Sequence, residues 1–307
     1  LHLGMRKIQS LLVSLSIACS SLSAQTIPLP EHPRPDFERT QWQNLNGVWQ
    51  FEFDSLDQGV SKKWNEGTAA FTHKITVPFP WGSQLSGVKD KADIAWYKRE
   101  ITINPEWKNK KTFLTIGASD WETTVWLDGK LLGTHQGGYT PFSFELTENL
   151  KYGQSQKLVV RADDKRRDFT LYGKQGYGNA RGIWQTVYVE ARGKEYVEAV
   201  HFTPDIDKNQ VTVTAYLPTE AKVDTKLSVS IKTSSTPIIK EVTIPKGKDK
   251  FIFSIAIPQA HLWSLEDPYL YEAEVKRGDD AVKTYFGMRK VSVVNLPGTE
   301  FPYVAIN

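Results

Sequence analysis

Residues 114–146 read LTIGASDWETTVWLDGKLLGTHQGGYTPFSFEL and contain the clearest turn in the chain. The pair Asp128-Gly129 separates two apolar runs, Val125-Trp126-Leu127 and Leu131-Leu132. Both central residues of a two-residue hairpin turn need a positive φ, which aspartate and glycine tolerate better than most residues. The stretch therefore predicts a β-hairpin whose Trp126 packs into a core.

The residues after the hairpin predict a neighbouring strand. Phe142, Phe144 and Leu146 alternate with polar residues, as expected of a strand with one buried face. Between hairpin and strand lies Gly137-Gly138, where the missing side chains let the backbone bend sharply or approach another group.

The first half of the chain repeats this alternation in short segments. Trp49, Phe51 and Phe53, for example, alternate with Gln50 and Glu52 after an Asn-Gly turn signal. No segment there has the period of a long helix. We therefore expect an antiparallel, jelly-roll-type β-sandwich. Its predicted strands, besides those around the hairpin, are residues 45–53, 75–78, 95–103, 112–116, 158–162 and 186–190.

The composition changes near residues 191–193. Nine of the ten tryptophans precede this point, and the second part consists of short alternating strands separated by turn residues. That spacing is typical of an immunoglobulin-like β-sandwich of about 100 residues. The predicted strands are residues 211–217, 227–231, 251–257, 269–275 and 291–293. The fold class is thus all-β, with two successive sandwiches.

The first residues resemble a signal peptide. Met5-Arg6-Lys7 supplies a positive start, Leu11 to Ala18 is a short apolar run, and Ala24 is a small residue suited to cleavage. We expect residues 1–24 to direct the protein to the periplasm or outside the cell. A lipid anchor at Cys19 is the less favoured alternative. The apolar run is too short to span a bilayer, so no membrane span is expected.

Charge and cysteine content exclude several classes of function. The formal net charge is +3 and falls to +1 without residues 1–24, which carry Arg6, Lys7 and no acid. A near-neutral chain lacks the electrostatic footprint of a nucleic-acid-binding protein. Cys19 is the only cysteine, so thiolate metal sites and disulfides are not expected after cleavage. The histidines are widely spaced, and we expect no metal and no cofactor.

One long segment, residues 163–184, has the composition of a binding loop. It reads DDKRRDFTLYGKQGYGNARGIW, and strands are predicted on both sides of it. Sugars bind to polar side chains at the ring edge and to aromatic side chains at the ring face. Asp164, Gln175 and Arg181 are therefore candidate sugar-binding residues. The alternative is a solvated loop with Trp184 in the core.

An ordered set of motifs resembles the N-terminal half of glycoside hydrolase family 2, the β-galactosidase, β-glucuronidase and β-mannosidase group. Each motif is weakly specific, but together they span nearly all of the chain after residue 24. The motifs are HPRP at 32–35, LNGVWQF at 45–51, VPFPWGSQLSGV at 77–88, WYKRE at 96–100, the hairpin stretch up to 146, GIWQTVYVE at 182–190, LWSLEDPYLYEAEV at 262–275 and YFGMRKV at 285–291.

The resemblance implies a sugar-binding jelly roll over residues 25–193 and an immunoglobulin-like sandwich over residues 194–294. Residues 295–307 would begin the connection to a (β/α)₈ barrel with two catalytic glutamates that hydrolyse β-glycosides with retention. That barrel is missing from this chain, so its catalytic residues are expected beyond Asn307 and the chain alone is expected to be inactive. Asp164 falls where some members place an aspartate near the sugar.

Two other functions are compatible with the sequence. A tryptophan-rich sandwich behind a signal peptide also suits a stand-alone carbohydrate-binding or adhesion module. The same domains could serve a structural role in a homo-oligomer. The expected partner is in each case a carbohydrate or a second copy of the chain.

Overall fold

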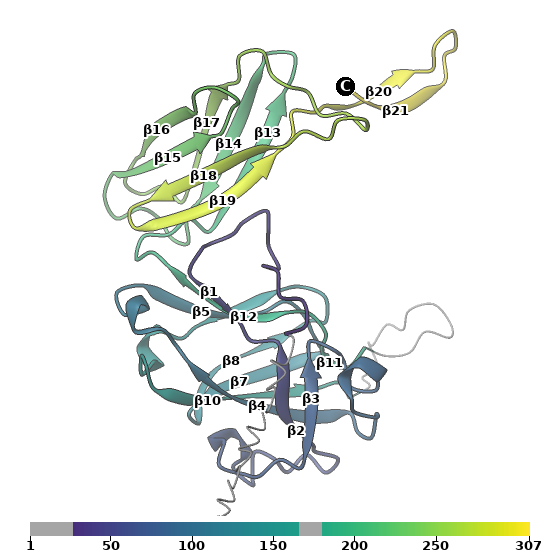
Figure 1. The fold of residues 1–307 in the computed structure, drawn as a ribbon, viewed down its shortest axis with the longest axis vertical. Coiled ribbons are helices and arrows are strands. Elements are labelled where there is room, and N and C mark those ends of the chain that lie inside the picture. Colours follow the sequence, from purple (N-terminus) through teal and green to yellow (C-terminus); the bar gives the residue numbers. More distant parts are fainter. Residues whose placement is uncertain (1–26, 166–179) are drawn as a thin grey trace, which may run out of the picture.

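A computed structural model describes residues 27–165 and 180–307 of the chain. Within these ranges the chain forms β-strands and four single-turn 3-10 helices, with no α-helix. The strands build two sandwiches that follow one another along the molecule (Figure 1). The predicted all-β fold, a jelly-roll-type sandwich followed by an immunoglobulin-like one, is confirmed. The predicted signal peptide at residues 1–24, with Cys19, lies outside the described residues.

The first sandwich packs a six-stranded antiparallel sheet against a four-stranded one. The six-stranded sheet has the order β3 (His73–Val77), β2 (Gly47–Phe53), β4 (Ile94–Thr102), β10 (Ser155–Asp163), β7 (Glu122–Leu127), β8 (Lys130–Gln136). The four-stranded sheet has the order β1 (Trp42–Asn44), β12 (Val187–Arg192), β5 (Lys111–Ile116), β9 (Phe142–Glu145). A short pair, β6 (Ser119–Asp120) with β11 (Gly182–Ile183), joins them at one edge.

The predicted hairpin is confirmed. Asp128 and Gly129 take φ values of 48° and 80° between β7 and β8. Val125 and Leu127 point into the main core, as alternation along a strand requires. Trp126, although only 8% exposed, points to the opposite face of the sheet. There it stacks on Trp96 in a separate small core cluster, so Trp126 is buried in a core as predicted, although not in the core between the two sheets.

The second sandwich has the three-plus-four strand arrangement of an immunoglobulin-like domain. One sheet consists of β13 (Ala199–Asp205), β14 (Gln210–Tyr216) and β17 (Lys250–Ala256). The other consists of β16 (Ile238–Ile244), β15 (Thr225–Ile231), β18 (Tyr271–Arg277) and β19 (Asp280–Phe286). A second apolar core, separate from the first, fills the space between these sheets.

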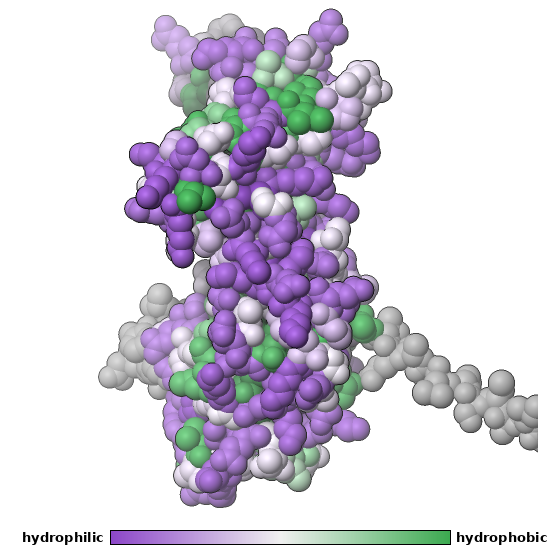
Figure 2. Space-filling view, turned by 90° about the vertical axis from the view of Figure 1, so that its left-hand side faces the viewer, coloured by the Kyte–Doolittle hydropathy of each residue, from purple (hydrophilic) through white to green (hydrophobic). Residues whose placement is uncertain are grey.

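A two-stranded hairpin of β20 (Val291–Asn295) and β21 (Pro302–Ile306) extends away from the second sandwich (Figure 1). Its apolar side chains are largely exposed, with Phe301 at 71% and Val293 at 71%. Elsewhere, the side of the molecule in Figure 2 is mostly hydrophilic, with small separate apolar patches on both sandwiches. In the described part of the chain no helix is long and apolar enough to cross a membrane.

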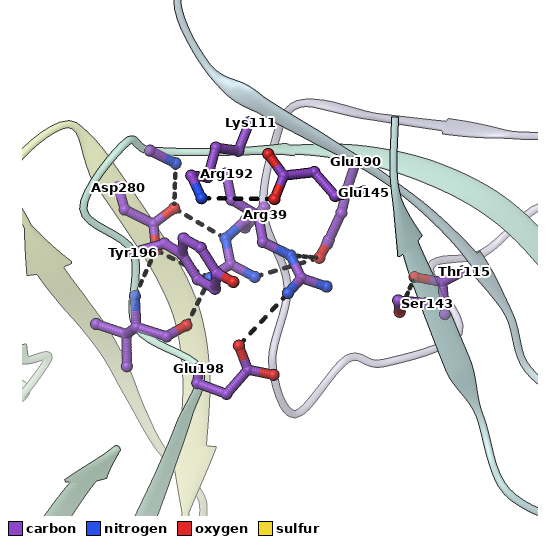
Figure 3. A network of polar contacts seen from close by, with 12 residues as sticks. Arg39, Lys111, Thr115, Ser143, Glu145, Glu190, Arg192, Tyr196, Glu198 and Asp280 are labelled. Carbon is purple, nitrogen blue, oxygen red and sulfur yellow. Dashed lines mark hydrogen bonds and ion pairs between the residues drawn. The ribbon is translucent and has the colours of Figure 1, made fainter. Parts of the chain in front are cut away.

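A buried polar network joins the two sandwiches (Figure 3). Arg39 donates two hydrogen bonds of 2.9 Å to the carboxylate of Asp280 and one of 2.8 Å to the carbonyl of Val197. A third nitrogen of Arg39 lies 3.3 Å from Glu190. The Asp280 carboxylate also accepts the backbone N–H groups of Gly193 and Val197. The buried carboxylates of Asp280 and Glu190 therefore both have hydrogen-bond donors.

Candidate functional site

A group of charged side chains lies at the edge of the first sandwich where β6 and β11 pair. Asp120 of β6 pairs with Gly182 of β11, and Arg181 directly precedes Gly182 in the chain. Asp164 follows the end of β10, and its backbone N–H donates to the carbonyl of Asp93 over 2.8 Å. Backbone pairing thus brings residues from four separate parts of the chain together. We call the group Asp90, Asp93, Asp120, Asp164 and Arg181 the acidic rim.

Arg181 is the cation of this group and is nearly buried. Its guanidinium is hydrogen-bonded to the carboxylate of Asp93, and its Nε lies 3.4 Å from a carboxylate oxygen of Asp90. The same Nε lies 3.4 Å from Asp164 and has no hydrogen-bond partner among the described residues. Three carboxylates therefore share one guanidinium. It is hydrogen-bonded to Asp93, whereas its Nε lies 3.4 Å from both Asp90 and Asp164.

The two inner carboxyl groups of the acidic rim bind protons more tightly than usual. Burial, together with the negative charge of Asp120, raises the pKa of Asp164 to about 6, although Arg181 opposes the rise. Burial also raises the pKa of Asp120, again against Arg181. Near pH 6 the carboxyl group of Asp164 therefore changes between a hydrogen-bond donor and an acceptor. A site with these properties is suited to binding hydroxyl groups, and perturbed carboxyls of this kind gather at functional sites.

Aromatic side chains lie beside the acidic rim. Trp184 donates its indole N–H to the carbonyl of Gly138 over 2.7 Å, and its ring meets that of Tyr139 edge to face at 5.8 Å. Tyr139 is 81% exposed. Gly138 lies directly against Asp120, since a Cβ on Gly138 would come within 2.7 Å of its carboxylate. An exposed aromatic face thus lies beside partly desolvated carboxyl groups, a combination suited to a sugar ring.

Glycine is required where β11 begins. Gly182 has a φ of 71°, and a Cβ there would lie 2.2 Å from the Trp81 ring and 2.3 Å from the Tyr97 hydroxyl. Any side chain would displace β11 and with it the adjacent Arg181. Within the glycine-rich segment 163–184, the fold therefore requires glycine at position 182.

Sequence reasoning found part of this group. The structure brings the predicted residues Asp164 and Arg181 together, whereas Gln175 lies outside the described residues. Asp163 is directed to Arg161, 3.1 Å away, and away from the rim, as alternation along the strand predicts. The sequence analysis missed Asp120 and Tyr139, although both stand in the stretch 114–146. The available signals were the position of Asp120 after a predicted strand and that of Tyr139 directly after the Gly137-Gly138 pair.

The acidic rim does not have the composition of a metal centre. In residues 27–165 and 180–307, no three or more histidine, cysteine, aspartate or glutamate side chains are arranged to hold a metal ion. The only strong cation of the rim is the guanidinium of Arg181, which already lies among the carboxylates. We therefore assign no metal or cofactor to it.

Two family profiles match the chain in order. The profile described as "Glycosyl hydrolases family 2, sugar binding domain" covers residues 42–191, which hold β1 to β12 and the acidic rim. The profile described as "Glycosyl hydrolases family 2" covers residues 195–289, which hold the strands of the second sandwich. Together the two profiles account for most of the chain.

Curated relatives agree with these profiles. A β-glucuronidase of Bacteroides fragilis is 27% identical over an alignment of 266 residues that covers 77% of this chain and 35% of that protein. A β-galactosidase of Thermoanaerobacter pseudethanolicus is 22% identical over an alignment of 253 residues that covers 76% of this chain and 31% of that protein. The chain thus spans about a third of the length of these relatives.

A solved structure shows the same arrangement of sandwiches. The β-glucuronidase from Ruminococcus gnavus in complex with D-glucuronic acid matches with a TM-score of 0.69 and 22% identity, covering 88% of this chain and 49% of that one. At this identity the likeness supports the fold alone. With the two profiles it leads to one conclusion: the chain belongs to glycosyl hydrolase family 2 and carries the family's sugar binding domain followed by its immunoglobulin-like domain.

Proposed function

We propose that this chain is the non-catalytic front part of a glycosidase that hydrolyses β-glucuronides or β-galactosides with retention. The observation that carries the proposal is the acidic rim. A domain of the sugar-binding type brings Asp164, Asp120 and Arg181 to one edge, with the pKa of Asp164 raised to about 6. In this proposal the rim borders the substrate cleft, and Gln175, which lies outside the described residues, would join it.

Each rim residue has a role that follows from its chemistry. Asp164 accepts hydrogen bonds from sugar hydroxyls when ionised and donates one when protonated. The Nε of Arg181 lies 3.4 Å from the carboxylate of Asp164 and orients it by its charge. The exposed ring of Tyr139 offers a face to the C–H groups of a sugar. These groups bind and orient a glycoside, and the chain alone is expected to hydrolyse nothing.

The exposed hairpin β20–β21 supports this proposal. An isolated two-stranded hairpin is marginally stable in water, and this one exposes Phe301, Val293 and Val304. Large exposed apolar surfaces mark contacts with other protein. We propose that further protein, the catalytic barrel of the same polypeptide, covers the hairpin and completes the cleft beside the acidic rim.

We also propose that the protein acts in the periplasm or outside the cell, because residues 1–24 have the composition of a signal peptide. N-terminal sequencing of the protein recovered from the periplasm or medium should begin at Gln25. Recovery of uncleaved protein from the cytoplasm would contradict this location.

The main test reads the gene past the codon for Asn307. The proposal expects an open reading frame that encodes a barrel with two catalytic glutamates. In that longer polypeptide, Asp164→Asn should lower kcat/KM for 4-nitrophenyl β-glucuronide or β-galactoside by roughly 10- to 100-fold, without loss of the fold. A stop codon directly after Asn307 in the intact gene, or hydrolysis by the 307-residue chain alone, would overturn the proposal.

A further inference from the structure

Apart from the acidic rim, a hollow of about 470 Å³ lies on the outer face of the sheet β1-β12-β5-β9. Its volume falls within the range of small-ligand sites. The hollow differs from the acidic rim in its chemistry, because none of the rim's carboxyl groups lines it. The residues that decide its chemistry are Thr115, Ser143, Tyr188, Gln185, Arg192 and Glu198.

The sheet face beneath the hollow is unusual because its outward side chains are buried. On β12, Val187 and Val189 point into the core, while Tyr188 and Glu190 point outward and are nevertheless 6% and 3% exposed. The N-terminal segment covers one side, with the His32 ring 5.6 Å from that of Tyr188. The linker between the sandwiches covers the other side through Tyr196. The hollow is the part of the face that these two segments leave open.

Hydroxyl groups form the floor of the hollow. Thr115 of β5 is paired in register with both Ser143 of β9 and Tyr188 of β12. The hydroxyls of Thr115 and Ser143 lie 2.8 Å apart, and Figure 3 marks this contact by a dashed line. Because all three residues lie on paired strands, these donors and acceptors are held rigidly. At the mouth, Gln185 is exposed and adds an amide.

The two guanidinium groups beside the hollow, those of Arg192 and Arg34, are already paired with carboxylates. Arg192 donates to Glu190 over 2.7 Å and lies 3.6 Å from Glu198 (Figure 3). Arg34 makes a two-point contact with Asp36 at 3.0 and 2.9 Å. Neither guanidinium is left unpaired for an anionic ligand. Paired guanidinium and carboxylate groups still offer donors and acceptors to neutral hydroxyls.

Apolar surface completes the walls. The rings of Pro33 and Pro141 line the hollow, whereas the guanidinium of Arg192, 4.0 Å from the Phe113 ring centre, occupies that ring's face. A fitting ligand therefore needs several hydroxyls for the floor, C–H groups for the proline walls and no net charge. A neutral saccharide meets these requirements.

We propose that the hollow is a second saccharide site, which takes a neutral sugar unit and is separate from the acidic rim. The proposal does not depend on the glycosidase function proposed above, because it rests on side chains within the described sandwich face. In a longer glycan, such a site would hold a neutral unit while the rim binds another. It would also act in a protein that never hydrolyses a sugar.

The test measures binding of four neutral disaccharides, lactose, cellobiose, mannobiose and xylobiose, to the 307-residue chain. Saturation-transfer NMR detects contact and calorimetry gives the Kd. Ser143→Phe fills the hollow from an exposed strand position, and Gln185→Ala removes the amide at its mouth. The matched control is Ser254→Phe, since Ser254 forms a similar exposed cross-strand pair with Thr212, 3.3 Å apart, on the second sandwich. Asp164→Asn removes the rim's main carboxylate.

At least one of the four disaccharides should bind with a millimolar or tighter Kd. Ser143→Phe should weaken that binding at least tenfold and Gln185→Ala at least threefold, while Ser254→Phe leaves it unchanged. A single cooperative thermal unfolding transition in each variant shows that the fold is intact. Absence of binding, or binding that survives Ser143→Phe, would overturn the second site. Binding that survives Ser143→Phe but is lost with Asp164→Asn would still support the rim, so the two proposals fail separately.

Discussion

The acidic rim and the domain junction both hold a buried arginine among carboxylates, and the difference between them separates a site from a scaffold. At the junction, Arg39 makes a parallel two-point contact with Asp280, and backbone N–H groups bind the same carboxylate. Burial alone would raise the pKa of Asp280, but the hydrogen bonds and charge of Arg39 hold it below its usual value. At the rim, Arg181 is shared, and the pKa values of Asp164 and Asp120 are raised.

The comparison shows that residue type alone does not distinguish a candidate binding site from a structural contact. A carboxylate whose pKa is lowered in the fold stabilises the folded state at neutral pH, whereas one whose pKa is raised destabilises it. The junction therefore contributes to stability, while the rim retains an energetic cost that a bound ligand could offset. Stability is given up at functional sites in this way in many proteins.

The largest expected effect is at the junction. Arg39→Met leaves Asp280 buried without its cation, while Glu190 keeps its contact with Arg192. The change should lower the free energy of unfolding by about 3–5 kcal/mol. Because the folded-state pKa of Asp280 is lowered, its contribution is present above pH 3.8 and is lost as pH falls through the folded value. The cost of Arg39→Met should therefore shrink in acid. Urea unfolding at pH 7 and pH 3 measures both.

Arg34→Met is the matched control for this prediction. Arg34 makes the same two-point contact with Asp36, but both side chains are about half exposed. Exposed pairs contribute little because water screens them, so this change should cost under about 1 kcal/mol. Equal losses for Arg34→Met and Arg39→Met would show that burial at the junction has no special effect.

A smaller loss is expected at the rim. Arg181→Met removes the cation from four carboxylates, but Asp90 and Asp93 are about half exposed and can be hydrated. The loss at pH 7 should be about 2 kcal/mol, below that of Arg39→Met. It should fall at pH 4.5, because Asp164 and Asp120 are then more protonated. A loss at the rim as large as that at the junction would contradict the contrast between them.

The sequence predicted the fold better than the site. Alternation at Trp49, Phe51 and Phe53 and the Asp128-Gly129 turn depend on near neighbours, so both could be identified from the chain alone. Alternation cannot tell the main core from a second buried face, so it predicts that Trp126 is buried but not in which cluster. Strand β16 was missed because its side chains are mostly exposed and its pattern is weak.

The site depends on pairing between distant strands. Asp164 and Arg181 were predicted from one loop composition and from family resemblance, and they do lie together. Asp120 joins them only because β6 pairs with β11, some 60 residues further along the chain. Arg39 and Asp280, 241 residues apart, were not predicted at all. Local patterns contain no information on such partners.

Asp164→Asn should stabilise the protein at pH 7. The folded-state pKa of Asp164 is about 6, above the ordinary 3.8, so the folded protein loses stability as pH rises from below 3.8 through 6. The difference corresponds to at most about 3 kcal/mol, and solvent near the rim reduces it to about 1–2 kcal/mol. The variant's gain should be present at pH 7 and absent at pH 3.5.

The reference for this change is Asp280→Asn. It should destabilise the protein at pH 7, because the pKa of Asp280 is lowered and its ionised carboxylate therefore stabilises the folded state. Unfolding of both variants by urea between pH 3.5 and pH 8 gives the two profiles. If the two changes shift stability in the same direction at pH 7, the rim and the junction are not opposites and the comparison fails.

The smallest effect on stability is expected for Tyr139→Ala. Because Tyr139 is 81% exposed and touches Trp184 at one ring edge, its loss should change the free energy of unfolding by less than about 0.5 kcal/mol. If the ring is a platform for sugars, saturation transfer to methyl β-D-glucuronide should fall, while Tyr285→Ala on the second sandwich leaves it unchanged. A clear drop in thermal stability would instead make Tyr139 part of the scaffold, and the rim would lose its aromatic face.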